Sequence, residues 1–371
     1  MMGNWKTCTI GDLGTVVGGA TPSTKKNENY DGGTISWITP KDLAGFSGRF
    51  ISRGERNITE QGLKSCSTQL MPAHTVLFSS RAPIGYIAIA DQEVCTNQGF
   101  KSVIPNEDTD YMFLYYLLKY NKVKIEKLGS GTTFKEVSGS TMRGVEVSVP
   151  DSIEEQRRIA SVLSVLDDKI EMNMEINENL SEQAQTIYTD IFVTNADPAW
   201  SLGYLSELIS VRYGKDHKKL NDGPFPVYGS GGVMRYVERP IYEKESVLIP
   251  RKGTLNNVMY VNEPFWSVDT MFFTEMKFPN IAKFVFHFVK SKDLASLNAG
   301  SAVPSMTTDI LNAMELYIPD AETLKHFESI VGPMYRAMQH NSEESKELAA
   351  ARDTLLPRLM SGELDVSELD I

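Results

Sequence analysis

The sequence predicts an α+β protein in which two duplicated mixed α/β domains are separated by two long helices that form an antiparallel intramolecular coiled coil. The first observation is an internal repeat, because residues 128–151 match residues 297–320 without a gap at an offset of 169 positions. The second is that each block ends in a strand-like stretch and Pro-Asp, after which a long helical pattern begins. The period far exceeds that of stacked repeats, so the match indicates a duplicated domain.

The repeat divides the chain into four segments. Residues 1–150 and 196–319 form the two globular domains, and residues 151–195 and 320–371 form the two long helical segments. The net charge is −11, and the excess of acidic residues lies in the helical segments, with 3 Lys/Arg against 10 Asp/Glu in the first and 5 against 11 in the second. The globular domains hold 29 of the 37 Lys/Arg residues, so the acidity of the whole chain does not exclude phosphate binding.

Within the globular domains the pattern alternates between short strands and loops rich in Gly, Pro, Ser and Thr. Two short apolar, aromatic-rich runs, at 112–118 and 284–289, are expected to be buried helices, because a membrane span needs roughly 20 apolar residues. We therefore expect no contact with a membrane. The predicted strands lie at residues 34–38, 75–78, 86–90, 246–249 and 258–261.

The first long helix has a clear start and a regular apolar seam. Ser152 and Glu155 follow Pro150-Asp151 and fit a capping box with Ser152 as N-cap. Apolar positions then alternate three and four residues apart from Leu163 to Ile191, and the same register recurs from Val331 to Leu359 at an offset of 168. Sustained spacing of this kind is typical of a coiled coil, and 40 helical residues span about 60 Å.

Polar residues interrupt both seams at the same place. Asn173 matches Asn341, and Asn177 matches Ser345. If a pseudo-two-fold axis relates the halves, the helices run antiparallel and Asn173 lies close to Asn341. The sequence then predicts a buried polar contact that fixes the register at some cost in stability. The alternative is that these side chains face solvent, as most Asn residues do.

Three motifs, in one order, extend across nearly the whole chain. They are Gly-Ala-Thr-Pro-Ser at 19–23, Glu-Glu-Gln-Arg-Arg-Ile-Ala at 154–160 and Leu-Pro-Arg-Leu-Met-Ser-Gly-Glu-Leu at 356–364. With the internal duplication, they resemble the specificity subunit of a type I restriction-modification enzyme. The second copy departs from the pattern, since residues 322–326 read Glu-Thr-Leu-Lys-His where the first has Glu-Glu-Gln-Arg-Arg. That leaves open whether partner docking is equally strong at the two ends.

The resemblance implies a sequence-specific DNA-binding subunit without catalytic residues or a cofactor of its own. Each globular domain would be a target-recognition domain that reads half of a bipartite, asymmetric site in double-stranded DNA. The helices would set the gap between the half-sites and dock two methyltransferase subunits and, in the full enzyme, restriction subunits. S-adenosylmethionine and ATP would bind to those partners only. Three cysteines without CxxC spacing and a polar N-terminus favour a cytoplasmic location.

Polar loop residues are the candidates for DNA contact, because they can bind phosphates or base edges. Lysine pairs are expected to hold phosphates, whereas Arg81 and Arg251 are the candidates for a guanine edge. The alternative for each residue is a solvated surface position. The first domain contributes Thr21, Ser23, Lys25, Lys26, Trp37, Lys41, Ser80, Arg81, Thr133 and Lys135, and the second contributes Tyr213, Lys215, Lys218, Lys219, Tyr228, Ser230, Arg251, Lys252 and Ser305.

The two domains share a frame and differ in their loops. Residues 76–81 parallel residues 247–252, whereas residues 18–26 and 213–219 have little in common. Such a frame suits two domains that bind different DNA sequences.

Two other functions remain open on the sequence alone. One is a nucleotide-handling enzyme that uses Gly-rich loops such as residues 228–232, although these lack the Lys-Ser/Thr of a P-loop. The other is a structural scaffold that binds only proteins. Five scattered histidines show no metal-ligand spacing, and we find no catalytic constellation in the sequence.

Overall fold

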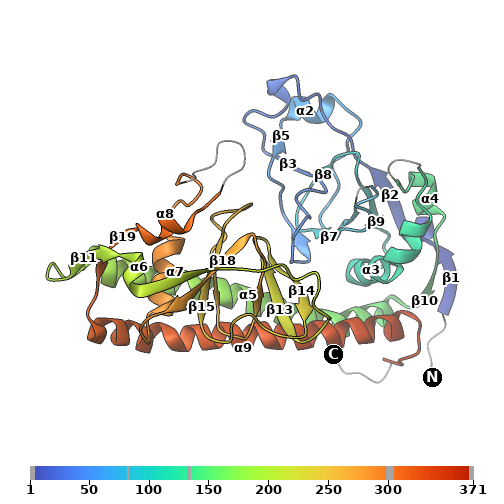
Figure 1. Cartoon of the computed structure of the whole chain (residues 1–371). Helices are drawn as coiled ribbons and strands as arrows, with labels where there is room; N and C mark the ends of the chain where they lie inside the picture. The colour runs from blue at the N-terminus through green and yellow to red at the C-terminus, as the bar shows by residue number, and fades with distance from the viewer. Residues whose placement is uncertain (1–4, 82, 132–134, 298–304, 367–371) are drawn as a thin grey trace. The chain divides into compact units, whose positions relative to one another are not determined.

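The computed structural model describes residues 5–81, 83–131, 135–297 and 305–366 (Figure 1). The chain forms two compact units: unit 1 comprises Met1–Met174 with Ser342–Ile371, and unit 2 comprises Glu175–Asn341. The two long helices, α5 (Ile153–Thr189) and α9 (Ala321–Met360), each contribute to both units. Each unit is therefore one globular domain together with a stretch of each long helix.

Unit 1 contains one five-stranded sheet and two smaller ones. The large sheet has the order β2-β9-β6-β7-β4, the three-stranded sheet has the order β5-β3-β8, and β1 pairs with β10. The strands are β1 (Trp5–Thr9), β2 (Gly14–Gly18), β3 (Ile35–Ile38), β4 (Phe50–Ile51), β5 (Asn57–Ile58), β6 (Val76–Phe78), β7 (Ile87–Ala90), β8 (Cys95–Thr96), β9 (Lys101–Pro105) and β10 (Glu146–Pro150).

Unit 2 repeats this topology. Its sheet order β12-β18-β15-β16 corresponds to β2-β9-β6-β7, and the parallel pairing of β13 with β17 corresponds to that of β3 with β8. The pair β11-β19 corresponds to β1-β10. The strands are β11 (Ser201–Tyr204), β12 (Ile209–Tyr213), β13 (Phe225–Gly229), β14 (Gly232–Val237), β15 (Ser246–Pro250), β16 (Met259–Val261), β17 (Trp266–Ser267), β18 (Met271–Met276) and β19 (Glu315–Ile318).

The helices of the globular domains also repeat. The predicted buried helices lie within α3 (Tyr111–Lys127) and α7 (Ala282–Lys290), and every predicted strand overlaps an observed one. Asp110 caps α3 by accepting a hydrogen bond from the amide of Phe113 at 2.9 Å. The short helices are α1 (Ile10–Leu13), α2 (Glu60–Lys64), α4 (Gly139–Arg143), α6 (Leu205–Leu208) and α8 (Thr308–Asn312).

Each globular domain shares one hydrophobic core with both long helices. In unit 1 this core joins Phe113 and Leu117 of α3 to Leu163 of α5 and Leu359 of α9. Each of these side chains is at most 2% exposed, and burial of such a side chain contributes about 1.5–3 kcal/mol. A domain detached from its helices would therefore expose much of its apolar interior.

Aromatic rings form the corresponding core of unit 2. Phe192 lies 4.7 Å from Phe284 of α7 and 5.0 Å from Phe327 of α9, measured between ring centroids with the edge of one ring facing the other. Tyr188 of α5 packs into the same cluster. Edge-to-face pairs of this kind add about 0.5–1.5 kcal/mol beyond the burial of their area.

Within each unit the two long helices contact each other in antiparallel directions. In unit 1, Asn173 Nδ2 donates to Glu344 Oε2 at 2.7 Å and to Ser345 Oγ at 3.3 Å. In unit 2, Asn341 Nδ2 donates to Asn177 Oδ1 at 2.9 Å. Residues later in α5 therefore contact residues earlier in α9, as antiparallel helices require. Because Asn173 is only 1% exposed, its amide lies inside the interface and does not face solvent.

Ser152 caps the start of α5, as expected, but Glu155 does not complete the expected capping box, since its side chain, which the structure describes, accepts no hydrogen bond from the amide of Ser152. The hydroxyl of Ser152 accepts from the amide of Glu154 at 3.2 Å, and the carbonyl of Ser152 accepts from Gln156 at 3.1 Å. The side chain of Gln156, in the same turn, accepts a hydrogen bond from the amide of Asp110 at 3.0 Å. The first turn of α5 is thus tied to the start of α3.

Charged groups anchor the globular domain of unit 1 to α5. Arg49 is 4% exposed, and its guanidinium donates to Glu171 at 2.8 Å and 3.1 Å and also pairs with Asp168. The backbone amide of Arg49 donates to the same Glu171 at 2.8 Å. Tyr116 of α3 donates to Asp167 at 2.6 Å, and Arg352 of α9 pairs with that carboxylate at 2.5 Å. Unit 1 is therefore held by directional contacts as well as by its core.

In unit 2, one buried residue of α7 contacts both long helices. His287 is completely buried, and its Nδ1 lies 2.8 Å from Gln185 Oε1 of α5. Its Nε2 lies 2.9 Å from the hydroxyl of Tyr335 on α9. Lys283, one turn earlier, pairs with Glu328 of α9 at 2.8 Å. These contacts fix the orientation of α7 on the helix pair.

Stability should depend on pH through His287. Burial lowers the pKa of His287 to about 3, from the ordinary value of about 6.5 for a histidine. Between these values the unfolded chain holds a proton on this imidazole that the folded chain does not. The stabilisation of the folded chain by neutral His287 is therefore complete above pH 6.5 and is lost as the pH falls toward 3. As the pH falls across this window, the free energy of unfolding of the wild type should decrease by up to about 1.4 kcal/mol per pH unit more than that of His287→Gln.

Urea unfolding at several pH values measures this difference in slope. His326→Gln, which changes an exposed histidine of α9, is the control and should retain the wild-type slope. Parallel pH dependence of wild type and His287→Gln would contradict the assignment.

Candidate nucleic-acid interface

In each unit the start of one loop closely approaches the backbone of a strand, β8 in unit 1 and β17 in unit 2. A Cβ added to Gly19, after β2, would lie 2.1 Å from the carbonyl oxygen of Thr96. A Cβ added to Gly214, after β12, would lie 2.6 Å from the carbonyl oxygen of Ser267. In each unit the next backbone amide donates to that same carbonyl, at 3.0 Å and 2.8 Å. Glycine is thus required at both positions, and the loops that follow start from equivalent points.

A second repeated contact lies at the ends of β6 and β15. Arg81 forms an isolated antiparallel bridge with Glu136, and Lys252 forms the same kind of bridge with Ser305. In both units a backbone hydrogen bond of 2.9 Å flanks the bridge. Arg81 and Lys252 therefore occupy equivalent backbone positions, and Arg251 precedes that position in unit 2.

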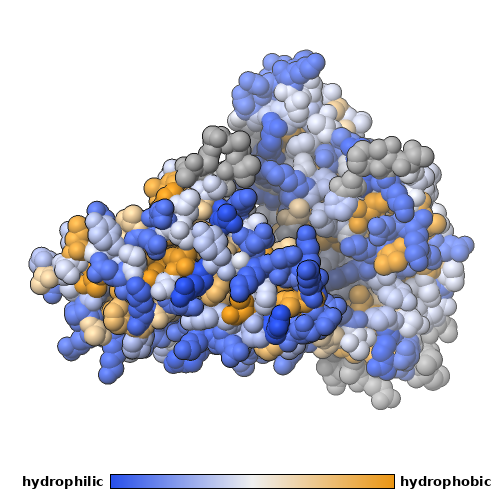
Figure 2. Space-filling model, viewed as in Figure 1, coloured by the Kyte–Doolittle hydropathy of each residue, from blue (hydrophilic) through white to orange (hydrophobic). Residues whose placement is uncertain are grey.

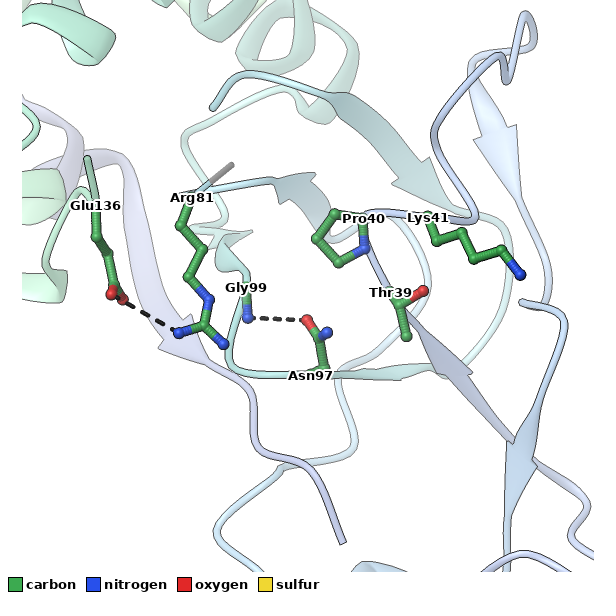
Figure 3. Close-up of a pocket in the computed structure, with 7 residues that line it drawn as sticks. All are labelled: Thr39, Pro40, Lys41, Arg81, Asn97, Gly99 and Glu136. Carbon is green, nitrogen blue, oxygen red and sulfur yellow. Dashed lines mark hydrogen bonds and ion pairs between the residues drawn. The ribbon is translucent and has the colours of Figure 1, made fainter. Parts of the chain in front are cut away.

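A pocket of about 550 Å³ surrounds the first of these bridges in unit 1. Figure 3 shows the residues that line it. Loops that follow β3, β6 and β8 form it together with the residue that bridges to Arg81. All its lining groups come from loops, the parts of a fold that most often carry binding residues. The lining consists of Thr39, Pro40, Lys41, Arg81, Asn97, Gly99 and Glu136.

The pocket carries both signs of charge. A nitrogen of Arg81 lies 4.0 Å from Glu136 Oε2, and Lys101 Nζ lies 3.5 Å from the other oxygen of this carboxylate. At the far side, Lys41 pairs with Glu55 at 2.6 Å, and this hydrogen bond raises the pKa of Lys41. Asn97 Oδ1 accepts from the amide of Gly99 at 2.8 Å (Figure 3). The pocket thus offers both hydrogen-bond donors and acceptors.

Most of the sequence-predicted candidates in unit 1 are accessible. Arg81 is half-buried, and the exposed ones are Thr21, Ser23, Lys25, Lys26, Lys41 and Lys135. Lys26 immediately precedes the short 3-10 helix Asn27–Asn29, which packs against α2. Figure 2 shows hydrophilic residues covering this end of unit 1. Thr133 lies outside the described residues.

Two candidates in unit 1 are buried and are removed from the set. Trp37 is 6% exposed, and its indole nitrogen donates to the carbonyl of Ala20 at 3.1 Å. Ser80 is 0% exposed, and its hydroxyl donates to the carbonyl of Gly99 at 3.2 Å. Both polar groups are hydrogen-bonded inside the domain, so neither side chain is available to a ligand at the surface.

In unit 2 the candidates are also mostly accessible. Arg251 lies over the ring of Tyr213, 5.4 Å from its centroid, and donates to the carbonyl of Asp269 at 3.3 Å. Tyr228 donates to Glu263 at 2.9 Å, and burial raises the pKa of Tyr228. The exposed candidates are Tyr213, Lys215, Lys218, Lys219 and Lys252, and the half-buried ones are Tyr228, Ser230, Arg251 and Ser305.

The structure adds residues that the sequence analysis missed. Thr39, Asn97 and Glu136 line the pocket beside Arg81, and Lys101 at the start of β9 pairs with Glu136. A carboxylate is not selected by a search for phosphate-binding side chains. The repeat itself could have pointed to Glu136, because it matches Ser305 at the same offset of 169.

Two further findings bear on the class of the protein. Among the described residues, no group of three or more His, Cys, Asp or Glu side chains could hold a metal ion. No helix within the same part of the chain is long and apolar enough to cross a membrane.

The duplicated fold, with equivalent loops in its two units, agrees with a known family. A family model described as the type I restriction modification DNA specificity domain matches residues 2–182 and 200–348. The chain belongs to this family.

Individual relatives are similar over most of their length. The type I restriction enzyme MjaIX specificity subunit of Methanocaldococcus jannaschii is 32% identical, with 99% of this chain and 95% of the relative covered. The type I restriction enzyme EcoprrI specificity subunit of Escherichia coli is 24% identical, with 82% and 81% covered. The crystal structure of a type I restriction-modification S subunit from M. genitalium has the same fold, with a TM-score of 0.60, 20% identity and 96% of each chain covered.

The comparisons confirm the resemblance inferred from the three motifs. They support neither a nucleotide-handling enzyme nor a scaffold that binds only proteins.

A side chain at Gly19 should displace the loop that carries Thr21, Lys25 and Lys26. Because the Cβ of Gly19→Ala would overlap a backbone carbonyl, we expect a loss of about 1–3 kcal/mol in the free energy of unfolding. Gly18→Ala is the matched control, since its Cβ would meet only the Lys101 side chain at ordinary contact distance. Chemical denaturation measures both, and equal effects of the two substitutions would rule out this steric explanation.

Proposed function

We propose that this protein is the sequence-specific DNA-binding specificity subunit of a type I restriction-modification system. It reads a bipartite, asymmetric site in double-stranded DNA and positions methyltransferase and restriction subunits there. The repeated loop frame carries the proposal: Gly19 and Gly214 occupy matching backbone positions, as do Arg81 and Lys252, while the surrounding side chains differ. One frame with two sets of side chains suits the recognition of two different half-sites.

The charge on the loops supports contact with DNA. Lys25 and Lys26 are exposed on one loop of unit 1, and Lys218 and Lys219 on the corresponding loop of unit 2. Such pairs suit phosphate contacts, which fix the position of a protein on a duplex, whereas the groups of the pocket suit base edges.

We infer that the chain contributes recognition and no chemistry of its own. Methyl transfer to an adenine inside a duplex requires the base to be turned out into an enzyme pocket, which a separate methyltransferase subunit would provide. S-adenosylmethionine and ATP would bind to such partner subunits in the cytoplasm, and the chain would hold no cofactor.

We further propose that α5 and α9 act as an antiparallel intramolecular coiled coil that sets the gap between the half-sites. The hydrogen bonds of Asn173 with Ser345 and of Asn177 with Asn341 support a fixed register. A buried amide can specify register in this way, because a slipped alignment would leave it without a partner.

Matching grooves support the docking of two methyltransferase subunits. In unit 1 a groove of about 610 Å³ lies between β1, β10 and the end of α9, where Glu146 and Ser361 line it. In unit 2 a groove of about 400 Å³ lies beside β11 and β19, lined by Glu315 and Val193. Because Glu146 and Glu315 are equivalent in the repeat, the two grooves suit two copies of one partner.

The groove of unit 2 is the more apolar. Leu202 is 60% exposed and Tyr317 is 55% exposed, and Figure 2 shows apolar residues over β11 and β19. Leu202→Glu should therefore reduce the complex from two methyltransferase subunits per chain to one. Sedimentation or native mass spectrometry measures the stoichiometry, with exposed Val233→Glu on β14 as control. If Leu202→Glu still binds two methyltransferase subunits, the groove of unit 2 is not a docking surface for them.

DNA binding by the purified full-length chain tests the proposed function. We expect salt-sensitive binding of duplex DNA and no turnover of S-adenosylmethionine, with methylation at a bipartite site once a methyltransferase subunit is added. Replacement of both Lys25 and Lys26 by Gln should lower the slope of log K against log salt by about 2 and weaken all sequences alike. Lys127→Gln, at the exposed end of α3, is the control. Indifference to DNA, or methyl transfer by the chain alone, would refute the proposal.

A further inference from the structure

The bridge at Arg81 is the point where the two units share a backbone and differ in chemistry. Unit 1 places an Arg and a Glu on the two bridged residues, and unit 2 places a Lys and a Ser there. Since the frame is the same, a difference in recognition at this position must come from these side chains.

The Arg81–Glu136 pair is poorly explained as a phosphate contact. The two side chains are 37% and 43% exposed, so they are accessible to a ligand. Glu136 also lies 3.5 Å from Lys101, and one carboxylate thus offsets two cations. A phosphate anchor would be stronger without this carboxylate, because like charges repel. The pair is therefore better suited to a ligand that presents acceptors beside a donor.

The major-groove edge of a G·C pair has this arrangement. Guanine offers the acceptors N7 and O6, and cytosine offers the N4 amino donor next to them. An A·T pair instead presents an acceptor, a donor and an acceptor in turn. The guanidinium of Arg81 supplies two parallel donors, and Glu136, 4.0 Å away, supplies an acceptor.

We propose that unit 1 reads a G·C pair through Arg81 on guanine and Glu136 on cytosine, and that unit 2 lacks this preference at the equivalent position. The inference rests on the proposed function and specifies one letter of one half-site. In unit 2, Lys252 supplies a single ammonium group in place of a planar fork. Arg251 does not replace it, since it precedes the bridge and lies over the Tyr213 ring.

Selection of duplexes from a randomised library by the full-length chain tests this inference. Wild type should enrich a bipartite motif with a G·C pair at a fixed position of one half-site. Arg81→Lys and Glu136→Ala should each reduce the preference at that position about tenfold, with the other letters and the second half-site unchanged. The double variant Arg81→Lys with Glu136→Ser places the side chains of unit 2 on unit 1 and should abolish the G·C preference there.

A second ion pair at the same pocket provides the matched control. Lys41 and Glu55 also join a cation to a carboxylate, but both are more than 60% exposed. Glu55→Ala should leave every letter of the motif unchanged. Unfolding curves of all variants should match the wild type, because exposed ion pairs contribute about 0–1 kcal/mol.

The outcomes separate the inference from the proposed function. A wild-type motif that persists in Arg81→Lys or Glu136→Ala overturns the inference and leaves the proposed function standing. Uniform weakening across all sequences also overturns it, because that result makes Arg81 a phosphate contact. If the wild-type chain enriches no sequence, alone or with a methyltransferase subunit, the proposed function itself fails.

Discussion

The central constraint on this protein is that each globular domain builds one of its hydrophobic cores jointly with the two long helices. The core of unit 1 contains side chains of α3, α5 and α9 together, and that of unit 2 contains side chains of α5, α7 and α9. Apolar contact alone allows sliding, but the charges of Arg49 and the two-sided hydrogen bonding of His287 are directional. Within each unit, the orientation of the domain on the helix pair is thereby set by groups that would lose their partners if it moved.

The positions of the loops that carry the candidate DNA contacts depend on this arrangement. Gly19 and Gly214 hold the start of one loop against a neighbouring backbone, and the bridge at Arg81 or Lys252 holds the end of another. Candidate DNA contacts therefore project from short segments fixed at the sheet. Recognition of base edges requires donors placed to within a fraction of an ångström, which a freely moving loop does not provide.

Much of the fold was predictable from the sequence, because the repeat and the periodicity of strands and helices reflect local chemistry. The site was less so. Trp37, near the end of a predicted strand, and Ser80, just after another, were chosen by residue type, yet both side chains face the interior, and side-chain direction at a strand end depends on tertiary packing. Arg251 was chosen with Arg81 by residue type, although the aligned register already matched Arg81 with Lys252. Glu136 was missed because its role depends on a neighbour 55 positions away in the sequence.

The part of the frame that the two units share consists of backbone atoms, and this explains how the two copies can differ in their side chains. The carbonyls of Thr96 and Ser267 accept the same hydrogen bonds although their side chains differ, and the bridges at Arg81 and Lys252 also use only main-chain groups. Substitution of a side chain at such a position leaves the frame intact, since no frame contact depends on it. Each unit can therefore change its base preference independently of its stability, provided that the glycines and the shared core remain.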